Sequence, residues 1–388
     1  MIGQTYPSEI KTYKDPETGR EIRQLTQGPY ENYHLYFTDN SFTLGDKEIW
    51  FMSNRPHAGT EIFNFCKMDL ETGLITQMTD EPDGILTLNH TKCPDSTILV
   101  YIVGRQLKKL DTVTGELSVI YEAPEGTTIS SPFISPDKKT VGIIRSERLD
   151  KYKNAANYGG FKESFYLIKR SWVILVNLDG SGFRTVVRDS CWCNHFQFSP
   201  LDPNVALFCH EGPWNLVNQR MYLVDCTSLE ITPCFRQEKD DCVGHEFWTR
   251  DGYIFFDNRG KGHDGTITSN RVQIFEGEVD ESAAYVGLAD SKGNVLKTIP
   301  MPYYCNHYHA NNDNTLLVGD QTDHLVLIDI HDEQHPTIKT LCNHGTSWTY
   351  QRTHCHPTFS LSCDQFLYPS NRDGVCNIYS IGYEDQDR

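Results

Sequence analysis

The sequence predicts an all-β fold, a seven-bladed β-propeller, from three observations. A unit recurs along the chain: a short strand ending near F-S-P-D, a Val/Ile/Phe-rich strand, a strand ending in Asp, and a last strand after a turn. Seven copies can be counted, each roughly 45 to 60 residues long. β-Branched and aromatic residues dominate the copies, which favours four-stranded blades over helical solenoids. We therefore expect a single propeller domain over residues 1–388.

The copies can be followed in chain order. The first begins at residues 41–43 and contains E-I-W-F-M-S-N, and the second contains T-I-L-V-Y-I-V. The other five begin at residues 131–137, 194–200, 244–248, 306–307 and 356–360. The first two copies also carry D-x-x-T-G, at 69–73 and 111–115, a hairpin signal that we expect to join outer strands.

The two ends of the chain are expected to meet in the last blade. The final copy has only three good strands, so the N-terminal segment 22–26 is predicted to supply the missing outer strand and close the ring. An insert at about 147–170, rich in Lys and aromatic residues, extends the third blade. It either sets the preferred substrate length or sugar, or only decorates the blade.

Charge and hydropathy exclude several classes of partner. The net charge is −17, from 35 basic and 52 acidic residues, which argues against nucleic acid or an anionic membrane surface. An anionic substrate would need a local cluster of cations. The chain has no run of about 18 apolar residues, and its N-terminus does not resemble an export signal. We expect a soluble, cytoplasmic protein, and the sequence carries no signal for an oligomeric state.

The cysteines are expected to be free. Their number, thirteen, is odd, and several lie in apolar strand-like stretches, as buried thiols do in a reducing compartment. Cys191-Trp192-Cys193, or Cys355 between two histidines, is an alternative soft-metal site, but no paired C-x-x-C motif supports zinc.

Four histidines share one phase of the repeat. His195, His245, His307 and His356 lie at the start of the first strand of four blades. The first strand of every blade lines the central channel of a propeller, so these imidazoles are expected to approach one mouth of the channel. A lone histidine at a strand start is more often a hydrogen-bonded structural residue.

The strongest local signal is the segment Q-R-T-H-C-H-P at residues 351–357. His354 and His356 are two residues apart and would point the same way on an extended strand. With His307 they offer three neutral imidazoles, and Gln351 adds an amide oxygen. Such a set suits Mn, Fe, Co, Ni or Zn. The alternative is a group of histidines hydrogen-bonded to the backbone.

A polar loop at residues 210–220 is expected between the two middle strands of the fourth blade. Arg220 can hold a carboxylate in a bidentate fork, which an anionic substrate would require. Alternatively, Arg220 pairs with Glu211 or Asp225 within the protein. We expect His210 and Trp214 of this loop, and His195, to contact the substrate.

The motif G-H-E-F-W at residues 244–248 offers a general base. His245 is the candidate, and Glu246 is next to it in sequence. Adjacent strand residues face opposite ways, so the two side chains are not expected to touch.

Together these motifs resemble those of the oligogalacturonate lyases, which belong to family 22 of the polysaccharide lyases. The resemblance extends from K-T-Y-K-D-P-E-T-G-R-E near the N-terminus to the final blade. It is densest at H-E-G-P-W-N-L-V-N-Q-R-M, G-H-E-F-W, C-N-H-G-T-S-W and Q-R-T-H-C-H-P. His309, two residues after His307, departs from the expected pattern.

The resemblance implies a cytoplasmic lyase of pectin degradation. Such enzymes cleave short, acidic galacturonides by β-elimination, releasing a 4,5-unsaturated monomer that rearranges to 5-keto-4-deoxyuronate, with manganese as the usual metal. By resemblance, the metal ligands are His307, Gln351, His354 and His356, the Brønsted base is His245, and Arg220 binds the substrate carboxylate. A divalent cation and an arginine would stabilise the enolate-like charge that forms as the C5 proton leaves.

Two alternatives stay open. A non-catalytic propeller that binds partner proteins would need neither a metal nor His354 and His356. A metal-dependent hydrolase, or a lyase for another uronide, would keep the site and change the product.

Overall fold

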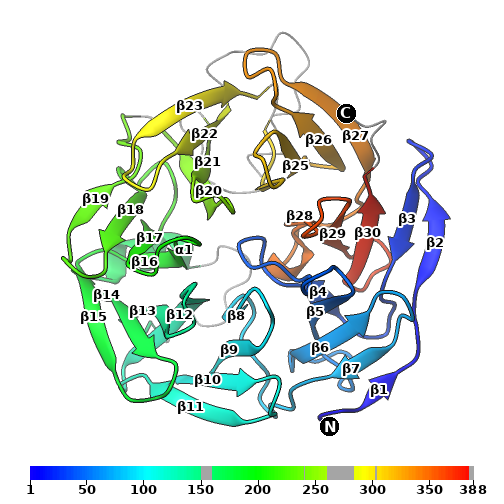
Figure 1. Ribbon diagram of the computed structural model, residues 1–388, viewed down its shortest axis with the longest axis horizontal. Coiled ribbons are helices and arrows are strands. Elements are labelled where there is room, and N and C mark those ends of the chain that lie inside the picture. The colour runs from blue at the N-terminus through cyan, green and yellow to red at the C-terminus, as the bar shows by residue number, and fades with distance from the viewer. Residues whose placement is uncertain (150–159, 240, 260–283, 302–303, 384–388) are drawn as a thin grey trace. The chain divides into compact units, whose positions relative to one another are not determined.

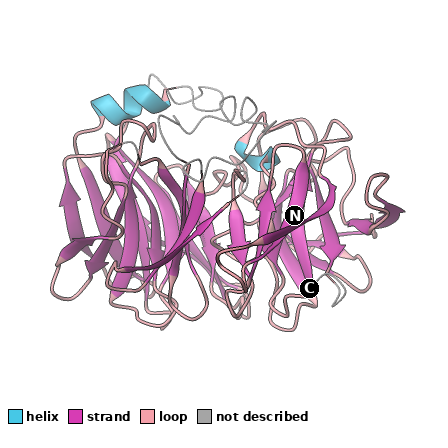
Figure 2. Ribbon diagram, turned by 90° about the horizontal axis from the view of Figure 1, so that it is seen from above, coloured by secondary structure: helices cyan, strands magenta, loops and turns pink. Residues whose placement is uncertain are grey.

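The chain folds into two compact units built almost entirely of strands. The computed structural model describes residues 1–149, 160–239, 241–259, 284–301 and 304–383. The first unit comprises Met1–Leu88, Pro94–Ser96 and Cys305–Arg388, and the second comprises Asn89–Cys93 and Thr97–Tyr304. Strands dominate the regular structure of both units (Figure 2). In the described residues no helix is both long and apolar enough to cross a membrane.

The first unit holds three antiparallel sheets, which Figure 1 labels by strand. One has the order β1 (Thr5–Tyr6), β7 (Ile75–Gln77), β6 (Asn64–Asp69), β5 (Glu48–Ser53), β4 (Asn32–His34). Another has the order β2 (Lys11–Lys14), β3 (Glu21–Gln24), β30 (Asn377–Gly382), β29 (Gln365–Ser370), β28 (Thr358–Phe359). The third runs β24 (Tyr308–Ala310), β25 (Leu316–Asp320), β26 (His324–Asp329), β27 (Thr337–Asn343).

The second unit holds four antiparallel sheets of four strands each. The first runs β11 (Leu117–Glu122), β10 (Gln106–Asp111), β9 (Ile98–Val103), β8 (His90–Lys92). The second runs β12 (Thr127–Ile134), β13 (Thr140–Glu147), β14 (Ser171–Asn177), β15 (Phe183–Asp189). The third runs β16 (Cys193–Phe198), β17 (Val205–His210), β18 (Met221–Asp225), β19 (Ile231–Pro233). The last runs β20 (Val243–Trp248), β21 (Ile254–Asn258), β22 (Tyr285–Ala289), β23 (Val295–Pro300). The two units thus supply the seven sheets that the seven repeats predict.

The N-terminal segment completes the last sheet, as predicted. Strand β3 pairs with β30 of the final repeat, with Ile22 opposite Ile381. Strand β2 pairs in turn with β3, so the N-terminus adds two strands to this sheet rather than one. Ile22 and Ile381 are both buried in the same apolar cluster, which ties the two ends of the chain together.

The D-x-x-T-G turns join outer strands, as expected. In the turn between β6 and β7, Asp69 Oδ1 accepts backbone N–H bonds from Glu71 and Thr72, at 3.1 and 2.7 Å. Gly73 has a φ of 73°, and a Cβ at this position would lie 2.0 Å from Ser8 Oγ. Glycine is therefore required here both by the backbone conformation and by the close contact.

A bulge recurs in the innermost strand of three sheets in the second unit. The pairing register shifts within β12, β16 and β20, between Ser130 and Phe133, Asn194 and Gln197, and Gly244 and Phe247. Ser131, His195 and His245 lie at these shifts, with φ values of 50°, 51° and 47°. A bulge re-aims the side chain that it carries. His195 and His245, which share one phase of the sequence repeat, therefore also share a β-bulge at the same position of the strand.

The insert at 147–170 connects β13 and β14 of the third repeat and contains α1 (Phe161–Leu167). Residues 150–159 of the insert lie outside the described residues. Phe165 of the helix lies against Gly212, where an added Cβ would be 2.4 Å from the phenyl ring. The helix therefore packs on the polar loop of the next repeat, which was expected to contact the substrate.

Candidate metal centre and catalytic residues

Three histidines of the first unit form a compact buried cluster. The candidate ligand atoms of His307, His354 and His356 all lie within 4.8 Å of one another. The ring centroids of His307 and His356 are 4.1 Å apart, and that of His354 lies 5.8 and 5.5 Å from them. All three side chains are buried. The cluster, which we call the histidine cluster, has the size of a single metal-ion site.

The histidines of the H-x-H pair do not lie on a strand, so this expectation was wrong. They follow the short 3₁₀-helix η2 (Gln351–Thr353) and precede β28, in a segment without regular structure. His356 has a left-handed backbone, with φ at 38°. The two imidazoles converge because of this local turn, and strand alternation is not the cause.

Asp320 orients His307. Its Oδ2 lies 2.7 Å from His307 Nδ1, and its Oδ1 accepts the backbone N–H of His307 at 2.5 Å. An ionised carboxylate only accepts, so His307 Nδ1 carries the proton and Nε2 keeps its lone pair. This is the arrangement of a histidine that ligates a metal through Nε2.

His354 is held in the neutral form that a metal ligand requires. Burial, together with the neighbouring His307, keeps its pKa well below the ordinary value. Among the described residues, its Nε2 atom is buried without a hydrogen-bond partner. A buried nitrogen without a partner is costly, and a bound cation would relieve that cost. The donor set therefore fits a divalent transition metal.

Aromatic rings enclose the histidine cluster. Phe37 is stacked on His356, with centroids 5.9 Å apart, and Tyr36 meets the same ring edge-on at 4.8 Å. The ring of Trp348 lies 5.4 Å from that of His354. This apolar wall limits water around the imidazoles and fixes their orientation.

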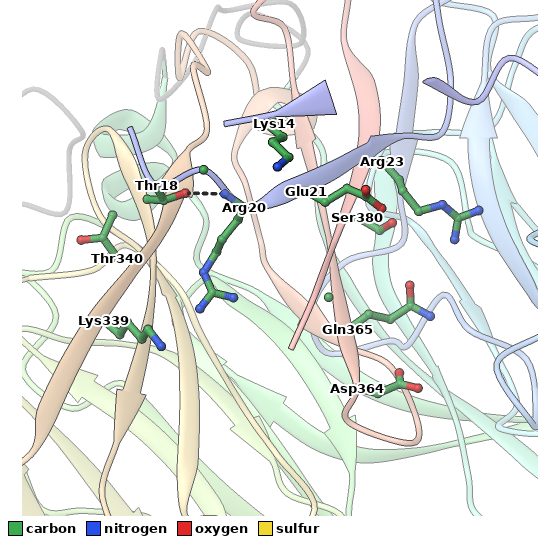
Figure 3. A pocket seen from close by; sticks show the side chains of 12 residues that line it. Lys14, Thr18, Arg20, Glu21, Arg23, Lys339, Thr340, Asp364, Gln365 and Ser380 are labelled. Atoms are coloured by element: carbon green, nitrogen blue, oxygen red, sulfur yellow. Dashed lines mark hydrogen bonds between the residues drawn. The ribbon is translucent and has the colours of Figure 1, made fainter. Parts of the chain in front are cut away.

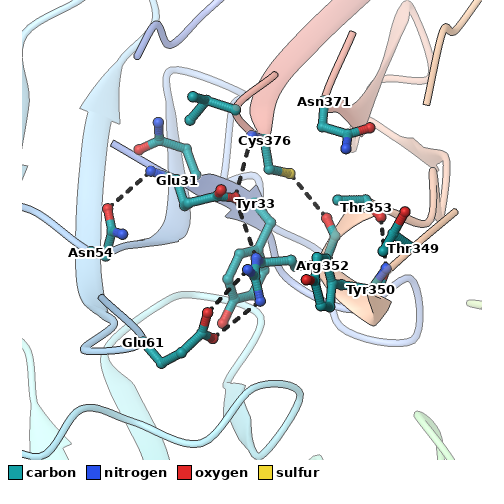
Figure 4. Close-up of polar contacts among 12 residues, drawn as sticks. Glu31, Tyr33, Asn54, Glu61, Thr349, Tyr350, Arg352, Thr353, Asn371 and Cys376 are labelled. Carbon is teal, nitrogen blue, oxygen red and sulfur yellow. Dashed lines mark hydrogen bonds and ion pairs between the residues drawn. The ribbon is translucent and has the colours of Figure 1, made fainter. Parts of the chain in front are cut away.

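An arginine clamps the segment that carries the cluster (Figure 4). Arg352 donates two parallel hydrogen bonds to Glu61, both at 3.1 Å, and a third to Glu31 at 3.2 Å. The thiol of Cys376 donates to the carbonyl oxygen of Arg352 at 3.1 Å. These contacts hold η2 against β4 and its neighbours and so position the residues that follow.

Two residues near the cluster have other contacts. Gln351 is the first residue of η2, and its carbonyl oxygen accepts the N–H of His354 at 3.2 Å. Its role as a fourth ligand stays a prediction. His309 Nδ1 accepts the backbone N–H of Phe359 at 3.3 Å, so this imidazole links β24 to β28.

In the second unit, Arg220 lies at the centre of a buried ion network. Its Nε and Nη1 donate to Glu246 and Glu211, each at 3.0 Å. His195 Nε2 lies 3.0 Å from the other oxygen of Glu211. Burial alone would raise the pKa of Glu211, but Arg220 and His195 hold it well below its ordinary range. The alternative of a pairing between Arg220 and Glu211 is confirmed, whereas the role in substrate binding stays a prediction.

A second arginine determines the protonation of His245. Arg259 Nη2 lies 2.5 Å from His245 Nδ1. A guanidinium only donates, so Nδ1 is the acceptor and the proton of the neutral ring sits on Nε2. Asp257 Oδ2 is 3.5 Å from the same Nδ1 atom and accepts from Arg259 Nε at 3.1 Å. Burial raises the pKa of Asp257 to about 7.

Trp214 links these two groups. Its ring meets His245 edge-on at 5.1 Å, and the guanidinium of Arg259 lies 3.5 Å above it. Arg220 approaches the same ring at 5.8 Å. Four of the predicted residues, His195, Trp214, Arg220 and His245, are thus brought into one connected group, which we call the arginine network.

The side-chain contacts of His210 are with residues outside the arginine network. Its Nε2 bonds Asp189 Oδ2 at 2.9 Å, and its ring packs 4.5 Å from that of Tyr222. Its role in substrate binding stays a prediction.

Sequence reasoning missed the carboxylates that orient the histidines. Asp320 is the last residue of β25, and Asp257 lies near the end of β21. Each is on the second strand of its sheet, whose first strand carries His245 or directly follows His307. An acidic residue at the end of the second strand of a histidine-bearing repeat was the available signal. Arg259, Arg352 and Phe37 offered no comparable pattern.

The first unit also has a cavity of about 820 Å³ that none of the predicted site residues lines (Figure 3). Its walls come from β2, β3, β27, β29 and β30 and mix both charge signs, with Lys14, Arg20, Arg23 and Lys339 against Glu21 and Asp364. We therefore keep the histidine cluster and the arginine network as the candidate functional residues.

Similar proteins bear on both the fold and the family. A profile of the oligogalacturonate lyase family matches residues 1–386. The oligogalacturonide lyase of Pectobacterium atrosepticum is 27% identical over 405 residues, covering 97% of each chain. A solved structure of an oligogalacturonate lyase in complex with manganese matches with a TM-score of 0.84 and 24% identity, over 100% of this chain and 99% of the other. The oligogalacturonate lyase of Vibrio parahaemolyticus also gives a TM-score of 0.84, with 23% identity and both chains fully covered.

These matches confirm the seven-bladed β-propeller that the repeats predict. The family profile spans nearly the whole chain, including both the histidine cluster and the arginine network. The chain therefore belongs to the oligogalacturonate lyase family and is a lyase of oligogalacturonides.

Proposed function

We propose that this protein cleaves short oligogalacturonides, digalacturonate among them, by metal-dependent β-elimination in the cytoplasm. The observation that carries the proposal is the histidine cluster, in which three buried imidazoles lie close enough to share one cation. The product would be 4,5-unsaturated galacturonate, which rearranges to 5-keto-4-deoxyuronate.

His307, His354 and His356 would hold the metal, with Gln351 as a further ligand. Manganese is our first choice, because a similar solved structure is described as a complex with manganese. When bound, the cation would withdraw charge from the uronate carboxylate and make the C5 proton more acidic. Asp320 supports this role because it keeps the lone pair of His307 on Nε2.

His245 would take the C5 proton. The contact with Arg259 blocks Nδ1 and leaves the ring proton on Nε2, so the ring needs a free nitrogen before it can act as a base. We propose that the uronate carboxylate draws Arg259 away, because a guanidinium binds a carboxylate more strongly than a neutral imidazole. The C5–H electrons then form the C4–C5 double bond as the C4–O bond breaks. The departing oxygen takes a proton from solvent, to which His245 returns the proton that it removed.

Arg220 would bind the substrate carboxylate through Nη2, since its ion pairs with Glu211 and Glu246 use Nη1 and Nε. The two carboxylates fix the guanidinium, so little entropy is lost when substrate binds. Trp214 and His195 would line the sugar, and His210 would contact it from the start of the same loop.

The reaction is tested by mass spectrometry of digalacturonate incubated with chelated enzyme, before and after manganese is restored. Products whose masses sum to that of the substrate, formed only with metal, are the expected result. Products heavier in total by one water would mean hydrolysis. Absence of cleavage under both conditions would overturn the choice of substrate.

The base assignment is tested by His245→Ala. We expect turnover to fall by at least about 100-fold, because general-base catalysis contributes that much, while manganese content stays at the wild-type level. Loss of manganese in parallel with activity would show that His245 is a ligand and would contradict its role as base. His354→Ala is the matched control and should lose both.

A further inference from the structure

We propose that Asp189, Cys193 and His210 of the second unit form a second metal site, one that takes a soft divalent cation such as Zn²⁺. The candidate ligand atoms of these three residues all lie within 4.8 Å of one another. This proposal rests on the geometry of the second unit alone. It gives His210 a metal ion in place of the sugar contact proposed above, and it does not otherwise depend on the proposed reaction.

The three residues are placed by strand pairing. Cys193 and His210 are direct partners across β16 and β17, so their side chains leave the same face of the sheet next to each other. Asp189 ends β15 of the preceding sheet, and its Oδ2 lies 2.9 Å from His210 Nε2. One sulfur, one nitrogen and one oxygen therefore converge from two neighbouring sheets.

The local contacts hold these donors in place. Tyr222 packs 4.5 Å from the ring of His210. Asp189 Oδ1 accepts the N–H of Cys191 at 2.9 Å, and Ser171 Oγ accepts the N–H of Cys193 at 3.2 Å. An ion would replace the His210–Asp189 hydrogen bond, since both atoms would then ligate it, while the backbone contacts of Asp189 and Cys193 would stay.

The site is open on one side. Cys193 is 1% exposed, whereas the side chains of Asp189 and His210 are 20% and 18% exposed. The thiol thus lies at the base of the site, and a hydrated ion can enter past the other two ligands. Water is the expected fourth ligand, because the group of ligand atoms within 4.8 Å of one another comprises only Asp189, Cys193 and His210.

The donor chemistry separates this site from the histidine cluster. A thiolate favours Zn²⁺ over harder cations such as Mn²⁺, whereas three imidazoles accept either. The ligands also join β15 of one sheet to β16 and β17 of the next, so the expected role is structural. A bound ion would brace the turn that carries Trp192, against which Phe161 of α1 packs at 5.4 Å.

The test is binding of Co²⁺ and Zn²⁺ to the chelated full-length protein. Cobalt bound to a thiolate gives a near-ultraviolet charge-transfer band, which three imidazoles do not produce. We expect this band in the wild type and in His354→Ala, and its loss in Cys193→Ser. Zn²⁺ should displace cobalt and abolish the band, while Mn²⁺ at the same concentration should not.

Two further variants keep the test decisive. Asp189→Asn changes a partly exposed ligand, and should weaken Zn²⁺ binding at least 10-fold even if Cys193→Ser fails to fold. Cys226→Ser, at a buried thiol outside the site, is the matched control and should keep the band. Absence of the band in the wild type, its persistence in Cys193→Ser, or an unchanged Zn²⁺ affinity in Asp189→Asn would overturn the proposal.

Discussion

The histidine cluster and the arginine network both place histidines beside a carboxylate, but they differ in the source of their positive charge. In the histidine cluster, Asp320 orients His307, and burial lowers the pKa of His354 so that it is neutral at neutral pH, so a positive charge has to come from outside. In the arginine network, Arg220 already lies between Glu211 and Glu246 at 3.0 Å from each. The comparison indicates that one site is prepared for a cation and that the other contains its own.

The largest expected effect comes from removing the internal cation. Arg220→Met leaves the buried Glu246 without its cation and Glu211 with His195 alone, and breaking a buried ion pair in this way costs about 3–5 kcal/mol. The free energy of unfolding in denaturant, measured on metal-free protein, checks this. His354→Ala is the contrasting variant and should cost less, because it leaves no buried charge unpaired. Equal losses in the two variants would contradict the distinction.

The next effect is a pH dependence within the arginine network. The pKa of Asp257 is raised by burial to about 7, so its contribution to stability is complete below about pH 4 and is lost as pH rises through 7. The free energy of unfolding of the wild type minus that of Asp257→Asn should therefore fall by up to about 4 kcal/mol from pH 4 to pH 8.

Glu211 is expected to give the opposite pH dependence of the free energy of unfolding. Its pKa is lowered, so the stability that it contributes is present above its ordinary pKa and is lost as pH falls below about 5. The same difference measured for Glu211→Gln should rise with pH. Parallel pH curves for Asp257→Asn and Glu211→Gln would show that the two carboxylates do not have opposed environments.

A smaller effect is expected from the carboxylate of the histidine cluster. Asp320→Asn removes the ionised acceptor that fixes the proton of His307 on Nδ1. Loss of such a partner typically weakens metal binding by about 10- to 100-fold. Titration of chelated protein with Mn²⁺ measures the change in affinity, with Asp329→Asn, a partly exposed acid on the adjacent strand β26, as control. Unchanged affinity in Asp320→Asn would exclude this orienting role.

The contrast between the two regions also explains what the sequence could reveal. The repeats predict the seven sheets because strand period and turn chemistry are local, and the closing pair Ile22–Ile381 follows from the missing strand. His354 and His356 were found because they are close in sequence. The left-handed backbone of His356 was not foreseen. The partners of Arg220 and His245 depend on which loop packs where, and spacing does not encode that.

The smallest effect tests whether the histidine cluster depends on its supporting clamp. Arg352 bonds Glu61, which is 72% exposed, and Glu31, which is 25% exposed, so its ion pairs are worth about 1 kcal/mol in all. Arg352→Gln should lower stability by about that amount and weaken Mn²⁺ binding a few-fold, because η2 lies directly before His354. Glu61→Gln removes only the more exposed partner and should change Mn²⁺ binding less. If Arg352→Gln lowered stability without changing Mn²⁺ binding, the turn that carries His354 and His356 would hold its shape without the clamp, and the aromatic wall of Phe37 and Trp348 would be the better explanation for its rigidity.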